Sequence, residues 1–180
     1  MPRSPRHEFA AGVHHVFARG NDRRRIFLSD DDRRIYLSLL KRTVERRRWL
    51  CLAYCLMPNH VHLLIETQEP NLGTGMHWLH AAYASTFNAR YDRSGHLFQG
   101  RYGSVRVESD EQLWTVARYL VRNPVEAGLC ARPEEYPWSS HREALAERQP
   151  RWIHRHRLLE YFDSVGGDAR RRYADYVGAG

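Results

Sequence analysis

Residues 57–66 of this 180-residue chain read Met57-Pro58-Asn59-His60-Val61-His62-Leu63-Leu64-Ile65-Glu66. The pair Pro58-Asn59 is typical of a tight turn, because proline presets φ and asparagine tolerates turn geometry. After the turn, apolar residues alternate with His60 and His62, and this period of two predicts a β-strand. Side chains two residues apart leave a strand on the same face, so the two imidazoles should lie about 6–7 Å apart at the backbone. Two imidazoles at this spacing can bind one metal ion.

The segments around this stretch alternate between strand and helix patterns. In chain order we expect a strand at 13–19, a helix that begins after Ser29, paired strands at 49–56 and 60–66, a helix at about 72–91 and a strand within 98–107. This β-α-β-β-α-β order predicts an α+β fold with a ferredoxin-like core and an antiparallel sheet. Helices on one face of such a sheet leave the other face free for chemistry.

A further helix is predicted at 109–123. Ser109 and Gln112 form a capping-box pattern, and Pro124 is expected to end the helix. On a helical wheel Tyr119 lies about 120° from the centre of the apolar stripe, so its phenol could reach the open face of the sheet. Asn123 follows one turn later on nearly the same face. Alternatively, Tyr119 is a boundary residue whose hydroxyl simply faces water.

The chain is basic, with 28 Lys and Arg against 21 Asp and Glu, a net charge of +7 and a pI near 9.7. A basic domain attracts polyanions, most commonly nucleic acid, although arginine-rich composition also follows from GC-rich codons. Residues that could contact phosphate or bases are Arg19, Asn21, Arg23, Arg24, Arg25, Asn59, Arg101, Tyr102 and Arg106. Arg101-Tyr102 combines a phosphate-binding side chain with a stacking ring, as single-strand binders do. Tyr102 could equally be a core residue.

Several classes of protein are disfavoured. No run of about 18 apolar residues predicts a membrane span, and the first residues lack the apolar segment of a signal peptide. Three cysteines argue against a disulfide framework and suit a reducing cytoplasm. A zinc site at Cys51 and Cys55 near the histidines is an alternative, but their spacing on a strand favours packing as small hydrophobic residues.

The whole pattern resembles the REP-associated tyrosine transposases, which belong to the HUH-type single-tyrosine transposases of insertion sequences. Five blocks carry the resemblance in order: 18–21 (ARGN), 53–64 (AYCLMPNHVHLL), 95–102 (GHLFQGRY), 117–129 (ARYLVRNPVEAGL) and 136–140 (YPWSS). They span most of residues 9 to 145, and the second contains the His-hydrophobic-His pattern of this superfamily.

The resemblance implies a mechanism and a partner. Tyr119 would attack a phosphorus of single-stranded DNA, form a 5′-phosphotyrosine and release a 3′-hydroxyl. His60, His62 and Asn123 would hold Mg²⁺ or Mn²⁺. The substrate implied is single-stranded DNA with palindromic hairpins, bound by a cytoplasmic, nucleoid-associated monomer or homodimer.

The resemblance also divides the chain. We expect a flexible tail at 1–8, an HUH transposase-like catalytic domain at 9–130 and a helical C-terminal extension at 131–180. Within the extension, Ser139 is expected to cap a helix, and two short helical patterns lie near 152–163 and 168–178. Two other functions remain open: a non-catalytic nucleic-acid-binding module with a ferredoxin-like sheet, and a zinc-dependent hydrolase.

Overall fold

The computed structural model describes residues 10–146, 152–163 and 167–178. Four strands form one sheet: β1 (Gly12–Arg19), β2 (Leu50–Met57), β3 (His60–Thr67) and β4 (Gly103–Arg106). The strand order is β2-β3-β1-β4, and every neighbouring pair is antiparallel. The predicted α+β fold with its antiparallel ferredoxin-like sheet is therefore confirmed. No helix within the described ranges is both long enough and apolar enough to cross a bilayer.

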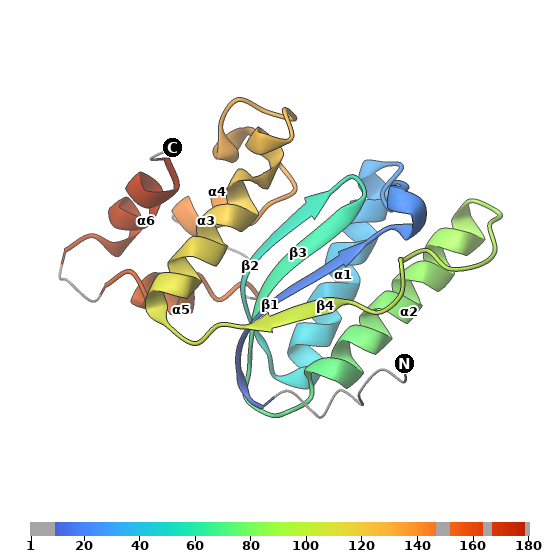
Figure 1. The fold of residues 1–180 in the computed structure, drawn as a ribbon, viewed down its shortest axis with the longest axis horizontal. Coiled ribbons are helices and arrows are strands. Elements are labelled where there is room, and N and C mark those ends of the chain that lie inside the picture. Colours follow the sequence, from blue (N-terminus) through green and yellow to red (C-terminus); the bar gives the residue numbers. More distant parts are fainter. Residues whose placement is uncertain (1–9, 147–151, 164–166, 179–180) are drawn as a thin grey trace.

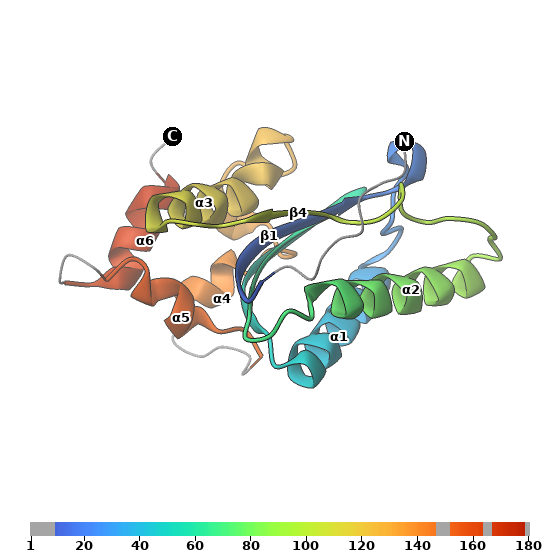
Figure 2. The ribbon, with the colours of Figure 1, turned by 60° about the horizontal axis from the view of Figure 1, so that its bottom comes forward.

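One face of the sheet is covered by α1 (Asp30–Arg47) and α2 (Leu72–Arg90), which lie together beneath the strands in Figure 2. Helix α1 begins as predicted, because the Ser29 hydroxyl accepts from the Asp32 amide and the Asp32 carboxylate accepts from the Ser29 amide at 2.9 Å. The apolar stripes of both helices meet the apolar face of β3. The shared core cluster includes Tyr36, Leu40, Leu79, Tyr83, Phe87, Val61, Leu63 and Ile65.

The opposite face is covered only in part, by α3 (Asp110–Glu126) and the helices that follow it (Figure 1). A second core cluster joins Leu64 of β3 to Leu113, Ala117, Leu120 and Val121 of α3. The short elements η1 (Asn21–Arg23) and η2 (Pro133–Glu135), with α4 (His141–Leu145), α5 (Arg155–Glu160) and α6 (Ala169–Gly178), complete the fold. Because both faces of β2 and β3 are covered, nearly every residue of these strands is buried.

The C-terminal segments pack on the edge of the sheet at β2. Isolated bridges join Cys51 to Ile153 and Cys55 to Ser139, and Phe162, Tyr173 and Val177 lie in the same cluster as α3. This packing covers the backbone edge that β2 would otherwise expose. The predicted tail at 1–8 lies outside the described residues.

The last strand lies within the predicted range 98–107 but is short, because residue 98 bridges Gly20 and Gly100 then turns with φ +90 before pairing resumes at Gly103. The predicted end of the next helix is wrong. Helix α3 continues through Pro124 to Glu126. The amides of Ala127 and Gly128 still find carbonyl partners inside that last turn, and Gly128 ends it with φ +69.

The expected Ser139 cap is also wrong. Ser140, not Ser139, precedes α4, and its hydroxyl accepts from the Tyr54 amide at 2.9 Å instead of capping the helix. The two C-terminal helical patterns form α5 and α6, and α5 is shorter than predicted because only residues 155–160 are helical.

Candidate active site

The predicted His pair lies on the partly open face of the sheet. In the antiparallel register Arg19 pairs with His60, Phe17 with His62 and His15 with Leu64, so these side chains share one face. Helix α3 lies on the side of the sheet opposite α1 and α2 (Figure 2), where it packs against β2 and β3. Its buried stripe faces the sheet, and Tyr119 and Asn123 therefore project from the flank towards the imidazoles.

The four residues predicted for catalysis and metal binding come together here. The ring centroids of His60 and His62 are 5.0 Å apart, and those of His62 and Tyr119 are 5.2 Å apart. Nε2 of His60 lies 3.3 Å from Oδ1 of Asn123. Tyr119 keeps 43% of its surface exposed, so its hydroxyl is accessible to a large substrate.

Asn59 determines the orientation of the His60 ring. Its Nδ2 donates to the Arg23 carbonyl at 3.1 Å, which leaves its Oδ1 to accept from Nδ1 of His60 at 2.7 Å. A neutral imidazole that donates from Nδ1 carries its lone pair on Nε2. Asn59, predicted as a DNA contact, therefore holds a candidate ligand in place.

Burial keeps the imidazoles neutral near pH 7. Desolvation is the largest cause that lowers the pKa of His62 to about 3, with His60, His15 and Arg19 adding repulsion. Desolvation also lowers the pKa of His60, and Arg19 acts in the same direction, while the contact with Asn123 opposes them. Neutral rings have the free lone pairs that a metal ligand requires.

A cavity of about 270 Å³ opens beside the two histidines. It is lined by Phe17, Ala18, Arg19, His60, His62, Gln99, Gly100, Arg101 and Gly103. Gly103 is needed here, because a Cβ at this position would overlap the Phe17 ring. The guanidinium groups of Arg19 and Arg101 make the cavity suitable for an anion such as a phosphodiester.

The segment after β1, which holds the predicted DNA contacts at 21–25, lies at the same end of the sheet. The Gly20 amide donates to the Asn59 carbonyl at 2.8 Å, and the Asn21 amide donates to the Leu97 carbonyl at 2.9 Å. These bonds tie the loop to the β2–β3 turn and to the segment that lines the cavity. Its side chains at Asn21, Arg23, Arg24 and Arg25 are exposed around this rim.

Two other predicted DNA contacts lie apart from the cavity. Tyr102 is only 5% exposed and packs in the core cluster of α1 and α2, so its ring is not presented as a stacking platform. Arg106 pairs with the buried His14 in the sheet register, which places it on the helix-covered side of β4. Tyr102 directly precedes β4 and Arg106 ends it, and their even separation along the chain puts both side chains on the helix side.

The zinc alternative at the cysteines does not fit the structure. Cys51 packs in the core cluster under α1 and α2, whereas Cys55 packs with Met57 and Tyr136 in another cluster. Burial raises the pKa of both thiols, which disfavours the thiolates that zinc needs. Across the described ranges, no three His, Cys, Asp or Glu side chains are grouped to hold a metal ion, so a centre at the His pair requires Asn123 or a substrate oxygen.

His15 is a site residue that the sequence did not single out. Its Nε2 lies 3.1 Å from Nδ1 of His62, and its ring centroid is 6.0 Å from that of Tyr119. The available signal was the pair His14-His15 in the first predicted strand, where alternation sends the two rings to opposite faces.

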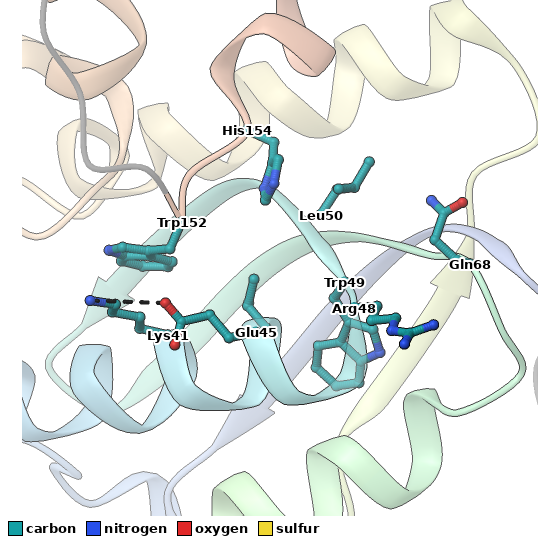
Figure 3. Close-up of a pocket in the computed structure, with 9 residues that line it drawn as sticks. Lys41, Glu45, Arg48, Trp49, Leu50, Gln68, Trp152 and His154 are labelled. Carbon is teal, nitrogen blue, oxygen red and sulfur yellow. Dashed lines mark ion pairs between the residues drawn. The ribbon is translucent and has the colours of Figure 1, made fainter.

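A larger cavity, of about 770 Å³, lies at the other end of the β2–β3 hairpin (Figure 3). It is lined by Lys41, Val44, Glu45, Arg48, Trp49, Leu50, Gln68, Trp152 and His154. Lys41 and Glu45 are one turn apart on α1 and form an ion pair along the cavity wall, at 3.9 Å. None of the residues predicted for catalysis or DNA contact lines it.

Comparison with known proteins gives the family. A family model described as "Transposase IS200 like" matches residues 9–123, a range that holds His60, His62, Tyr119 and Asn123. The chain belongs to the IS200-like transposase family. This membership confirms the resemblance found in the sequence and makes the chain a transposase-like DNA-processing protein.

One curated relative and one solved structure are similar to this IS200-like chain. A Haemophilus influenzae protein assigned by name to the REP-associated tyrosine transposases is 28% identical over 142 residues, which cover 72% of this chain and 80% of the relative. A solved structure of a REP-associated tyrosine transposase bound to a REP hairpin matches the fold with a TM-score of 0.68 and 16% identity. That match covers 83% of this chain and 89% of the solved chain.

Proposed function

We propose that this protein is a metal-dependent single-strand DNA endonuclease and strand transferase, which acts through a 5′-phosphotyrosine intermediate on hairpin-containing repeat DNA. The observation that carries the proposal is the convergence of Tyr119, His60, His62 and Asn123 on one open face of the sheet. The names of the relatives supply the class of DNA.

The donor set fits a divalent cation. With Nδ1 of His60 donating to Asn59, Nε2 carries a lone pair and faces the carbonyl oxygen of Asn123 at 3.3 Å. A divalent cation bound by both atoms would offset the repulsion between their lone pairs at this distance. Imidazole and amide oxygen suit Mn²⁺, and Mg²⁺ can complete its oxygen shell with water and substrate phosphate. When bound, the ion would act as a Lewis acid on the scissile phosphate.

Tyr119 would perform the covalent step. Its Oη would attack the phosphorus, form a new P–O bond and lose the phenolic proton, while the bond from phosphorus to the 3′ oxygen breaks. The leaving oxygen would take up a proton and become a 3′-hydroxyl. Tyr119 is 43% exposed, so a DNA strand can reach its side chain, and the phosphotyrosine conserves the bond for rejoining.

The basic rim would hold the strand in place. Arg19 and Arg101 line the cavity, and the exposed arginines at 23–25 extend the positive surface from its edge. Phosphate contacts of this kind position a nucleic acid without reading its sequence. The hairpin would therefore be selected by its shape and by bases that reach the cavity.

The decisive experiment compares the unmutated protein with Tyr119→Phe on labelled hairpin DNA taken from the repeats that flank its own gene, with Mn²⁺ present. The unmutated protein should form a covalent adduct that resists boiling in detergent, with the label on the DNA 5′ end that is joined to protein. Tyr119→Phe should form no adduct, a loss of more than about 1,000-fold, while hairpin affinity stays unchanged. Tyr176→Phe on α6 is the matched control and should retain the adduct.

The alternative outcomes have clear meanings. An adduct with Tyr119→Phe would place the nucleophile elsewhere. If neither protein forms an adduct but both bind the hairpin, the protein is a binding module instead.

A further inference from the structure

We infer that His15 is a positioning residue, which holds the His62 ring so that only Nε2 is left to bind a divalent cation. The inference rests on the proposed function, because it concerns the same site. It adds a residue from β1 to a set that otherwise comes from β3 and α3.

The register places His15 within reach of His62. Phe17 is the direct cross-strand partner of His62, and His15 lies two residues away on the same face of β1, which makes it a diagonal neighbour. The two rings are 5.2 Å apart at their centroids, and Nε2 of His15 lies 3.1 Å from Nδ1 of His62. This distance is that of a hydrogen bond between ring nitrogens.

The bond determines which nitrogen of His62 is available. Since Nδ1 of His62 is engaged with His15, Nε2 is the remaining nitrogen for any other partner. For Nε2 to carry a lone pair, Nδ1 must carry the proton and donate it to His15. A cation at Nε2 therefore selects the arrangement in which His15 is the acceptor.

His60 is held in the equivalent way by a different residue. Its Nδ1 donates to Asn59, so both candidate ligands would use Nε2 and be supported through Nδ1. Ligating histidines almost always have such a supporting partner on the second nitrogen. Asn59 supports the more exposed ring and His15 the buried one, since His62 is 6% exposed.

The surrounding rings alone do not provide this support. Phe17 lies 6.3 Å and Tyr119 5.2 Å from His62 between ring centroids, and both limit rotation of the imidazole. However, neither contact distinguishes ring nitrogens from ring carbons, because a 180° flip that exchanges Nδ1 with Cδ2 and Nε2 with Cε1 keeps nearly the same packing. Only the bond to His15 makes the two orientations unequal.

The test is titration of the full-length protein with MnCl₂, in which free Mn²⁺ is followed by its electron paramagnetic resonance signal. His15→Phe keeps a ring and removes both nitrogens, and it should weaken Mn²⁺ binding about 10- to 100-fold. His15→Gln places an amide oxygen near the position of Nε2 and should restore binding to within about threefold. Val105→Ala removes the exposed cross-strand neighbour of His15 and should bind like the unmutated protein.

Thermal unfolding of each variant shows whether the fold is kept. Equal Mn²⁺ affinity in His15→Phe and the unmutated protein would overturn the inference, as would no measurable Mn²⁺ binding by the unmutated protein. Equal losses of Mn²⁺ affinity in His15→Phe and His15→Gln would also overturn it, because they would show that His15 acts through packing and not through its hydrogen bond to His62.

Adduct formation on hairpin DNA, measured on the same samples, separates this inference from the proposed function. If the unmutated protein forms the adduct while Mn²⁺ affinity does not depend on His15, only the His15 inference fails. If Mn²⁺ affinity follows the expected order but no protein forms the adduct, only the proposed function fails.

Discussion

The two faces of the sheet are made by alternate residues of the same strands but have opposite character. Val61, Leu63 and Ile65 of β3 are fully buried under α1 and α2, whereas His60 and His62 face the cavity on the other side. One strand thus stabilises the fold with one set of side chains and positions the candidate chemistry with the other. This difference means that the site can be altered without changing the main core, and that the core can be altered without changing the site.

The adjacent residues His14 and His15 show the same division within β1. His14 is fully buried on the helix side, where its Nε2 lies 3.1 Å from the Ala10 carbonyl oxygen. His15 points to the other face and contacts His62 and Tyr119. Two identical side chains therefore have unrelated roles because the strand sends them to opposite faces.

Among substitutions that compare the two faces, the largest effect should come from removing the imidazoles on the open face. His60→Ala or His62→Ala should reduce Mn²⁺-dependent cleavage of hairpin DNA by more than about 100-fold, because each removes a candidate ligand. Circular dichroism of both variants should match that of the unmutated protein, since the helix-side core is untouched. Full cleavage by the unmutated protein in EDTA would contradict a metal mechanism.

A substitution on the helix side of the same strand should lower stability and leave cleavage per folded molecule unchanged. Leu63→Ala removes a fully buried side chain next to His62 in sequence and should lower the free energy of unfolding by about 2–5 kcal/mol. Urea denaturation measures this loss. Cleavage per folded molecule should stay near that of the unmutated protein at low temperature.

Leu28→Ala is the control for Leu63→Ala, because Leu28 is 48% exposed and its truncation should cost less than about 0.5 kcal/mol. If Leu63→Ala abolished cleavage in fully folded protein, the two faces would be coupled.

Much of this arrangement could be predicted from local patterns. The alternation at 60–66 placed both imidazoles on one face, and the spacing of Tyr119 and Asn123 placed them one turn apart on a helix flank. These predictions depend only on strand and helix periods, which the structure keeps. The order of strands and helices likewise gave the fold class.

The remaining features depend on contacts between distant segments. His15 meets His62 only through the β1–β3 register, across 47 positions of sequence. The burial of Tyr102 and the side on which Arg106 lies follow from where β4 begins, which the turn at Gly100 sets. Pro124 stays inside α3 because the later amides of that turn find other carbonyl partners. None of these contacts is visible in a local pattern.

DNA affinity should depend on the arginines of the open face. Arg19→Ala and Arg101→Ala should each weaken hairpin binding severalfold and reduce the slope of log affinity against log salt by about 1, because each removes a phosphate contact. Arg106→Ala, an exposed arginine on the helix side of β4, is the matched control and should change both quantities less. Fluorescence anisotropy over a range of NaCl concentrations measures both.

The hairpin should also bind more tightly than its reverse complement in the same anisotropy assay. Equal affinity for any polyanion, or an equal loss with Arg106→Ala, would mean that the attraction comes from overall charge and not from this face.

The smallest effect should come from a change at Glu66, which tests how far the candidate active site extends along β3. Glu66 shares the face of His60 and His62, but Arg157 of α5 donates to both of its carboxylate oxygens, at 2.8 and 3.1 Å. Its role should therefore be to attach the C-terminal helices to β3.

Arg157 is 38% exposed, so water screens the pair, and Glu66→Gln should lower the free energy of unfolding by only about 1 kcal/mol. Glu160→Gln removes the second acidic partner of Arg157, which is 61% exposed, and should change stability less. Mn²⁺ affinity and cleavage should be unchanged in both variants, because the Glu66 carboxylate is already occupied by Arg157. A loss of Mn²⁺ binding in Glu66→Gln alone would instead extend the metal site along β3.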